Sequence, residues 1–151
     1  MNINYKIKSF DESINEILPL SKKHYEEICV FSDHNHLFNP NLKLYKLLDE
    51  SKSIKIYCAY LDETLIGYLV YNVYPHSHLE NLYVATQDLF YVVKEYRKNG
   101  VGDGLIKFSE KDLKENKINF IIQCVSIKND FSPILFKNGY KPLDCNFIKE
   151  L

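Results

Sequence analysis

A chain of 151 residues suits one domain, residues 1–151, and can bury a core without disulfides or a structural metal. The composition, 46% hydrophobic and 26% charged, is typical of a folded globular protein and argues against disorder. Lysine and arginine number 19 against 20 aspartate and glutamate residues, so no global field attracts nucleic acid or an anionic membrane. Any phosphate must therefore be held locally.

The cysteines indicate neither a zinc site nor a disulfide framework, because no CxxC pair and no Cys/His cluster of zinc-ligand spacing occurs. We expect reduced thiols and no metal. The first ten residues lack an apolar signal core, and no run approaches the ~20 apolar residues that span a bilayer. These features predict a cytoplasmic protein without membrane contact.

The first third of the chain predicts one strand and two helices. Residues 3–9 alternate apolar and polar side chains, which is the period of a half-buried strand. Asp11 or Ser13 can cap the helix that apolar spacing predicts for residues 14–29. A proline at its start and a helical apolar repeat predict a second helix over residues 40–51.

The middle of the chain predicts strands. Two runs rich in β-branched and aromatic residues, 54–60 and 65–74, are joined by the short polar segment 61–64, which indicates a hairpin. A third run, 82–93, is long enough for another strand. These runs place three strands next to one another in the chain.

The last third returns to mixed elements. Two glycines interrupt residues 99–102, and the amphipathic pattern that follows predicts a helix to about residue 116. Residues 119–125 are nearly all apolar, as in a strand covered on both faces. A short helix over residues 131–137 ends before Gly139, which can take the positive φ of a helix C-terminus. Two further strands are predicted at 141–145 and 147–151.

The segment from Asp88 to Leu105 has the pattern of an anion site: strand, turn, glycine-containing loop, helix. The first N–H groups of a helix have no internal acceptor, and the helix dipole adds positive potential there. Gly100 and Gly102 remove side chains where a phosphate would approach, and Arg97 can form paired hydrogen bonds with phosphate oxygens. The alternative is that the two glycines only form a tight turn.

The sequence of this loop, Arg97-Lys-Asn-Gly-Val-Gly102, matches the R/Q-x-x-G-x-G/A signature of the GNAT acetyltransferase family. The chain resembles that family in element order over nearly its whole length, whereas the specific motif covers only residues 88–105. The resemblance implies an α/β (α+β) fold with a mixed, mainly antiparallel sheet of six to seven strands and helices on both faces. The implied order is β-α-α-β-β-β-α-β-α-β-β.

A narrower likeness concerns acetyltransferases of bacteriophages and prophages. It is carried by the sequence around His24 and Glu27, by His78, by Gln87-Asp88 and by the closing residues 147–151. This resemblance implies an enzyme that acts on a host protein.

The family resemblance implies acetyl-CoA as acetyl donor. In the family, two strands separate beside the signature and main-chain groups there hold the pantetheine arm, a role that falls to Val92 and Val93. The expected helix-start asparagine is displaced, with Lys128 at its position and Asn129 beside it. The backbone amides implied to hold the diphosphate are those of Lys98, Asn99, Gly100, Val101, Gly102 and Asp103.

Catalysis requires a group that takes a proton from the attacking amine. Period-2 alternation would place Asp88 on one face with Phe90 and Val92, and the resemblance implies that an acidic residue there acts as base, directly or through water. The alternative is that Asp88 caps a strand end or pairs with a cation. His24 and Glu27 share one helix face and could line an amine pocket.

Further histidines and a tyrosine complete the candidates. His76 and His78 share one parity in an extended segment and could also line the pocket, although a single histidine is more often a solvated polar residue. The family's proton donor is a tyrosine four residues before Gly139, and that position is Leu135 here. Tyr140, another tyrosine or water must then protonate the leaving thiolate.

The sequence does not decide whether the acceptor is a small amine, a nucleobase-linked amine or a protein lysine. The near-neutral net charge disfavours nucleic acid. A non-catalytic acyl-CoA-binding module that acts through protein contact is the alternative, because Leu135 replaces the proton donor. A homodimer is compatible with either function.

Overall fold

The structure is a computed structural model that describes residues 2–29 and 37–149. Its elements follow one another as β1 (Ile3–Lys8), α1 (Phe10–Ile28), α2 (Leu42–Glu50), β2 (Ile54–Leu61), β3 (Thr64–Pro75), β4 (Tyr83–Val92), the 3-10 turn η1 (Lys94–Tyr96), α3 (Val101–Glu115), β5 (Phe120–Ile122) and α4 (Ser132–Lys137).

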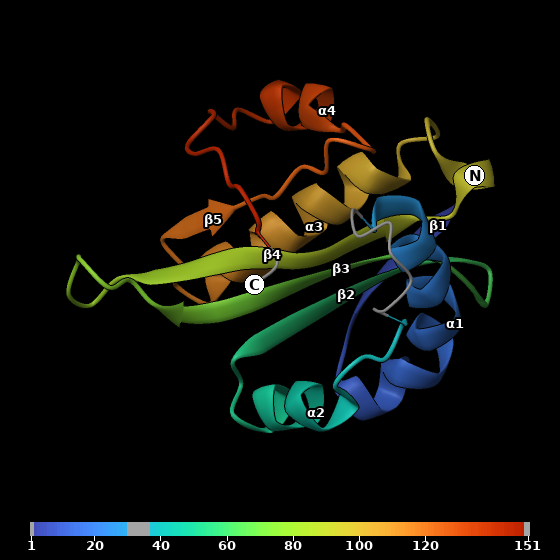
Figure 1. Cartoon of the computed structure of the whole chain (residues 1–151), viewed down its shortest axis with the longest axis horizontal. Helices are drawn as coiled ribbons and strands as arrows, with labels where there is room; N and C mark the ends of the chain where they lie inside the picture. The colour runs from blue at the N-terminus through green and yellow to red at the C-terminus, as the bar shows by residue number, and fades with distance from the viewer. Residues whose placement is uncertain (1, 30–36, 150–151) are drawn as a thin grey trace.

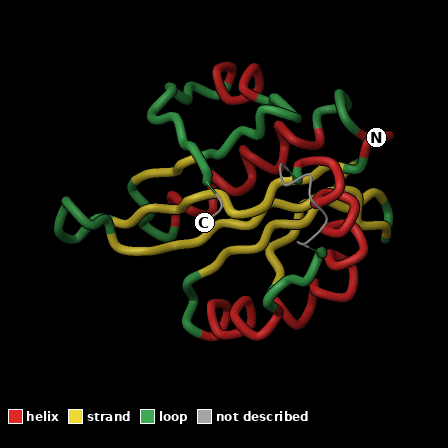
Figure 2. The backbone as a smooth tube through the Cα atoms, viewed as in Figure 1, coloured by secondary structure: helices red, strands yellow, loops and turns green. Residues whose placement is uncertain are grey.

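The strands form one sheet in the order β1-β2-β3-β4-β5. Neighbours are antiparallel from β1 to β4, whereas β4 and β5 are parallel. Figures 1 and 2 show α1 and α2 on one side of the sheet and α3 and α4 on the other. The predicted mixed, mainly antiparallel sheet with helices on both faces is confirmed.

The predicted six to seven strands are wrong for the described residues, which contain five. Residues 141–149 form no strand, and residues 150–151 lie outside the described part of the chain. The apolar side chains of Leu143, Phe147 and Ile148 are 69%, 93% and 70% exposed, so they do not contribute a buried face to the sheet. β5 is also shorter than residues 119–125 and leaves Phe120 43% exposed, because it is an edge strand rather than one covered on both faces.

Two cores lie on opposite faces of the sheet, because successive strand side chains point to opposite sides. In β2, Ile56 and Cys58 pack with α1, whereas Tyr57 and Ala59 pack with α3. The side chain of Tyr57 is fully buried, and burial of a large apolar side chain stabilises a fold by about 1.5–3 kcal/mol.

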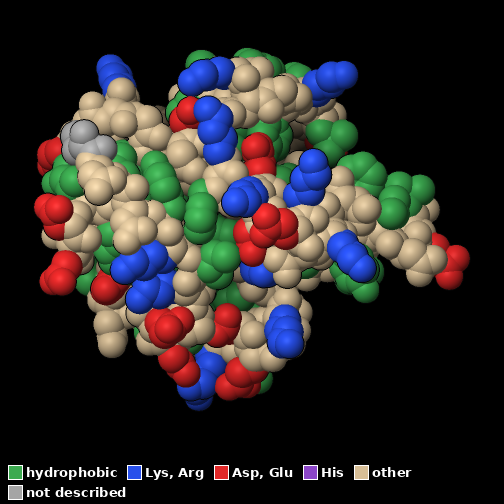
Figure 3. Space-filling model, turned by 180° about the vertical axis from the view of Figure 1, so that it is seen from behind, with side chains coloured by type: hydrophobic (Ala, Val, Ile, Leu, Met, Phe, Trp, Pro, Cys, Tyr) green, Lys and Arg blue, Asp and Glu red, His purple; other side chains and the backbone are tan. Residues whose placement is uncertain are grey.

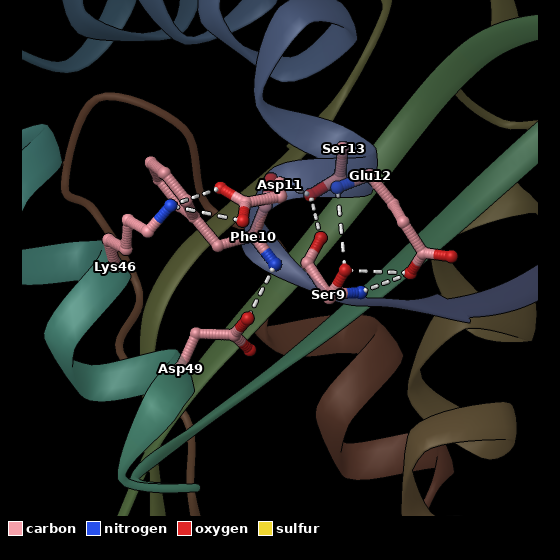
Figure 4. A network of polar contacts seen from close by, with 7 residues as sticks. All are labelled: Ser9, Phe10, Asp11, Glu12, Ser13, Lys46 and Asp49. Atoms are coloured by element: carbon pink, nitrogen blue, oxygen red, sulfur yellow. Dashed lines mark hydrogen bonds and ion pairs between the residues drawn. The ribbon is translucent and has the colours of Figure 1, made fainter.

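The first turn of α1 is capped by Ser9, and not by Asp11 or Ser13 as predicted. The backbone N–H of Glu12 donates to Ser9 Oγ at 3.4 Å, and Glu12 Oε2 accepts from the Ser9 N–H at 2.8 Å (Figure 4). This reciprocal capping box satisfies N–H groups that a helix start leaves unpaired. Ser13 instead donates its hydroxyl to the Ser9 carbonyl at 2.7 Å.

The same turn of α1 is tied to α2. The N–H of Phe10 donates to Asp49 Oδ2 at 2.9 Å, and Lys46 Nζ lies 3.1 Å from Asp11 Oδ2 (Figure 4). The Lys46–Asp11 pair is solvent-exposed and contributes little by itself. Together these contacts hold the two helices side by side over one face of the sheet.

Candidate functional site

A β-bulge interrupts β4 at Asp88. The register pairs Leu89 with Val70 and Gln87 with Tyr71, so Asp88 is the extra residue on its strand. A bulge of this kind lets two successive side chains lean to the same face and re-aims the strand beyond it.

The bulge changes the face that Asp88 occupies. Tyr45 of α2 donates its hydroxyl to Asp88 Oδ2 at 2.6 Å, which places the carboxylate on the α1/α2 side. Phe90 and Val92 pack with the opposite core, under α3. The prediction that Asp88 shares a face with them is therefore wrong, because the extra residue breaks the period-2 alternation.

The edge of β4 that faces β5 is open after the bulge. Pairing with β5 ends at Thr86 and Ile122. The Gln87 side chain then bridges the two segments: its Nε2 donates to the Cys124 carbonyl at 3.0 Å, and its Oε1 accepts from the Cys124 N–H at 3.3 Å. From Asp88 to the end of β4, this edge pairs with no strand in the described parts of the chain.

Val92, but not Val93, offers backbone groups to this open edge. The Val93 N–H donates to the Ile66 carbonyl at 2.9 Å, and the Val93 carbonyl accepts from the Tyr96 N–H at 2.9 Å. Neighbouring residues of an antiparallel strand point to opposite edges, so the Val92 groups face the opening. The Val92 carbonyl there accepts from Arg97 Nε at 2.8 Å. Val93 therefore does not fit its predicted role.

The glycine loop leads from this opening into α3. Gly100 is the N-cap, with φ of 80°, a conformation that favours glycine. The first helical hydrogen bond runs from the Gly104 N–H to the Gly100 carbonyl at 2.9 Å. The N–H groups of residues 98–103 have no acceptor among residues 2–29 and 37–149. Six main-chain donors thus gather at the positive end of a 15-residue helix, which is an arrangement suited to an anion.

Gly102 has a different role from the predicted one. A Cβ built at this position would lie 3.2 Å from Phe90 Cζ and 3.9 Å from Val92 Cγ2. Its missing side chain therefore lets the first turn of α3 pack against β4. Only its N–H remains to contact a phosphate.

Asp103, like Gly102, can offer a phosphate only its backbone N–H. Its carboxylate accepts from Asn138 Nδ2 at 2.7 Å and from Lys107 Nζ at 2.9 Å, and these bonds lower the pKa of Asp103 to about 2. The side chain thus ties α3 to the end of α4, and the backbone N–H is the group left for a ligand.

Arg97 anchors the loop to α1. Its NH2 group donates to Glu27 Oε2 at 2.7 Å, and its guanidinium lies 5.3 Å from the ring centroid of Tyr91. Burial would raise the pKa of Glu27, but the hydrogen bond and charge of Arg97, with Lys94 3.7 Å away, hold it below its usual value. Two of the directed donors of Arg97, Nε on the Val92 carbonyl and NH2 on Glu27, thus serve the fold and not a phosphate.

His24 belongs to this packed network. It is 6% exposed, its Nδ1 lies 3.3 Å from the Tyr68 hydroxyl, and its ring packs on Tyr91 at 5.2 Å between centroids. Burial lowers the pKa of His24 to about 4, with the nearby Arg97 acting in the same direction and Glu27 opposing it. The imidazole is neutral at pH 7 and is a weak base there.

Tyr140 and Asp88 lie on opposite faces of the sheet. Tyr140 packs in the α3 core, and burial raises its pKa, although Gln123 Nε2 lies 3.5 Å from its hydroxyl. Leu135 is buried in the same core. The structure therefore does not bring Tyr140 together with the Asp88 carboxylate.

His78 lies away from the glycine loop, whereas Asn129 lies in the segment that precedes α4. The His78 N–H donates to His76 Nδ1 at 3.1 Å in the turn before β4, and the His76 ring packs on Phe120. That turn and the loop are at opposite ends of β4, roughly 30 Å apart at 3.4 Å per residue. The Asn129 N–H donates to the Ser126 carbonyl within its own loop at 3.1 Å.

Sequence analysis missed Tyr45 and the cavity beside it. A cavity of about 300 Å³ lies between α1, α2 and the sheet, and both Tyr45 and Leu89 line it. No local pattern marks Tyr45, because its contact with Asp88 joins residues 43 positions apart. The apolar positions of both helices were the available signal, and they were assigned to the core.

Charge and metal ligands are dispersed. The face in Figure 3 shows basic and acidic side chains interspersed over its surface. The described ranges contain no group of three or more His, Cys, Asp or Glu side chains placed to hold a metal. They also contain no helix with the length and apolar character needed to span a bilayer.

Residues 14–140 match the model of the acetyltransferase (GNAT) family. No curated protein matches the chain significantly. Among solved structures, an aminoglycoside acetyltransferase from an uncultured soil metagenomic sample, in complex with sisomicin, is similar with a TM-score of 0.77 and 13% identity, over 99% of this chain and 96% of that one.

Two further structures are similar. A ribosomal-protein-alanine N-acetyltransferase from Brucella melitensis has a TM-score of 0.74 and 14% identity, over 99% of both chains. A predicted acetyltransferase from Clostridium acetobutylicum with acetyl-CoA has a TM-score of 0.71 and 15% identity, over 99% of this chain and 96% of that one. At these identities the likeness concerns the fold.

Proposed function

The chain belongs to the GNAT family of acetyltransferases, and on this premise we propose that it moves the acetyl group of acetyl-CoA to a primary amine by direct attack, with Asp88 receiving the amine proton. The observation that carries the proposal is the set of unpaired N–H groups of residues 98–103 beside the open edge of β4. Acetyl-CoA fits these residues, because a diphosphate matches the helix start and an extended amide-bearing arm matches a strand edge.

When bound, acetyl-CoA supplies an activated thioester carbonyl carbon, which the amine nitrogen attacks while the thiolate leaves. An alkyl amine has a pKa of about 10 and is protonated at neutral pH, so a base must remove a proton. Asp88 is exposed, sits at the bulge and is oriented by Tyr45 at 2.6 Å. It takes the proton directly or through one water.

Solvent protonates the thiolate in this proposal. Burial and the hydrogen bond to Asp88 raise the pKa of Tyr45, so this hydroxyl keeps its proton and orients the carboxylate. Leu135 and Tyr140 lie in the opposite core and do not reach the Asp88 side. Protonation by solvent, and not by a placed side chain, predicts a modest turnover rate.

A thiol-release assay with acetyl-CoA and a panel of amines tests the proposal. Asp88→Asn should lower turnover at pH 7 by about 100-fold or more, the range expected for loss of a general base, and leave acetyl-CoA affinity nearly unchanged. Asp62→Asn, an exposed carboxylate in the β2–β3 turn, is the matched control and should retain activity. Equal turnover of the two variants would remove Asp88 from the mechanism.

The alternative is an acyl-CoA-binding module without catalysis, which the buried Leu135 at the proton-donor position favours. Acetyl-CoA binding by calorimetry without thiol release on any amine would support it. Action of a phage-type enzyme on a host protein also remains a prediction. Two residues that suggested it, His24 and Glu27, lie in the packed Arg97 network.

A further inference from the structure

The cavity between α1, α2 and the sheet has a size and a lining that define a ligand class. Its volume is about 300 Å³. An apolar cavity of about 150 Å³ can hold one benzene ring, so this one has room for about two rings. Its walls come from both helices, from residues 37–40 and from the inner face of the sheet, where Ile56, Val70 and Leu89 contribute.

The lining contains no charged side chain among the described residues. Both of its serine hydroxyls are already engaged: Ser13 donates to the Ser9 carbonyl at 2.7 Å, and Ser21 donates to the Leu18 carbonyl at 3.0 Å. A cationic group placed there would lose its hydration without meeting a carboxylate among the described lining residues, which costs several kcal/mol.

The cavity connects directly to the proposed base. Tyr45 lines it with its ring and donates its hydroxyl to Asp88, while Leu89, the residue after Asp88, lines it as well. An amine beside the exposed Asp88 carboxylate can therefore have its body in the cavity. In this arrangement the amine nitrogen stays solvent-exposed beside Asp88, and the rest of the amine is buried in the cavity.

We propose that the acceptor is a small primary amine carried on a compact apolar group, such as an aromatic ring on a short alkyl chain, and that this group fills the α1–α2 cavity. The proposal rests on the proposed acetyltransferase function. It opposes an aminoglycoside acceptor, whose several ammonium groups require carboxylates that the described part of the lining does not contain.

Thiol release from acetyl-CoA, with 2-phenylethylamine, ethanolamine, sisomicin and a lysine peptide as acceptors, tests the proposal. The kcat/KM for 2-phenylethylamine should exceed that of ethanolamine by at least about tenfold, the usual value of an apolar group in a fitting pocket. Higher kcat/KM for sisomicin or the peptide would overturn the proposal while leaving the acetyltransferase intact. Acetyl-CoA binding without thiol release on any amine would overturn the proposed function and this inference with it.

A pair of variants of α2 locates the site. Leu42 lines the cavity and Leu44 does not, and both lie in the first turn, where an acidic residue suits the helix dipole. Leu42→Glu should lower kcat/KM for 2-phenylethylamine at least about tenfold, whereas Leu44→Glu should change it less than about twofold. Equal effects of the two variants would show that the apolar group binds elsewhere.

Discussion

Replacement of Gly102 by proline isolates one backbone N–H of the glycine loop. Gly102 is the second helical residue of α3, and Pro133 occupies the second position of α4, so proline at this point is compatible with a helix start in this chain. Gly102→Ala is the matched control. Both substitutions add a Cβ that meets Phe90 Cζ at 3.2 Å, and only proline removes the N–H.

The expected difference follows from the energy of a hydrogen bond to a charged group, about 1.5–3 kcal/mol. Gly102→Pro should therefore bind acetyl-CoA roughly 10- to 150-fold more weakly than Gly102→Ala. Isothermal calorimetry measures both affinities, and thermal melts establish that both variants fold. The difference should disappear with S-acetylpantetheine, which lacks the diphosphate.

Equal affinity of the proline and alanine variants for acetyl-CoA would refute the reasoning. It would mean that the N–H of Gly102 does not contact the diphosphate, and that the glycines serve only the turn and the packing of α3 on β4. A difference that persists with S-acetylpantetheine would point to distortion of the helix start.

Two further predictions concern the fold around the site. Gly104→Ala should lower the free energy of unfolding by about 1–3 kcal/mol in urea titrations, because its Cβ would lie 1.9 Å from the Tyr5 hydroxyl; an unchanged midpoint would show that Tyr5 moves freely. The second prediction concerns His24, whose pKa is about 4 in the folded protein and 6.5 in the unfolded chain. Because the folded state holds the imidazole neutral, its contribution to the free energy of unfolding is complete above pH 6.5 and is lost as pH falls to about 4. Wild-type protein should lose up to about 3 kcal/mol over that window; His24→Phe should show a flatter profile, and parallel profiles would contradict the assignment.

Element types could be predicted because their signals are local. The hairpin at residues 61–64 is confirmed by the pairing of Leu61 with Thr64. Gly139 has the predicted positive φ, 85°. The true cap of α1 was also present as a local signal, because Ser9 and Glu12 have capping-box spacing. Because the helix was predicted to start at residue 14, the capping-box spacing of Ser9 and Glu12 was not assigned to its first turn.

The bulge at Asp88 could not be predicted, because it depends on how β4 aligns with β3. Nothing within residues 83–92 indicates an extra residue, yet the register shift moves the carboxylate to the other face. The roles of Arg97 and Tyr45 were missed for a related reason. Their partners, Glu27 and Asp88, are 70 and 43 positions away, and a residue type alone does not indicate such a pair.

The strands predicted at the C-terminal end show that local sequence alone does not determine whether a strand forms. Strands were predicted at 141–145 and 147–151, but a strand forms only where a neighbour and a face are available to it, and Leu143, Phe147 and Ile148 are exposed. Residues 141–149 pair with no strand of the described sheet, whose last member, β5, contributes only three paired residues.

The two proposed ligand sites share α1. His24 lines the apolar cavity, and Glu27, one helical turn later, holds Arg97 of the glycine loop at 2.7 Å. The Glu27 side chain is 16% exposed, so loss of its charge would leave the Arg97 guanidinium poorly paired at the loop. This ion pair therefore connects α1 to the glycine loop, and the hydrogen bond from Tyr45 connects α2 to Asp88. The two helices that line the proposed acceptor cavity are thus each joined by one polar contact to another part of the proposed site.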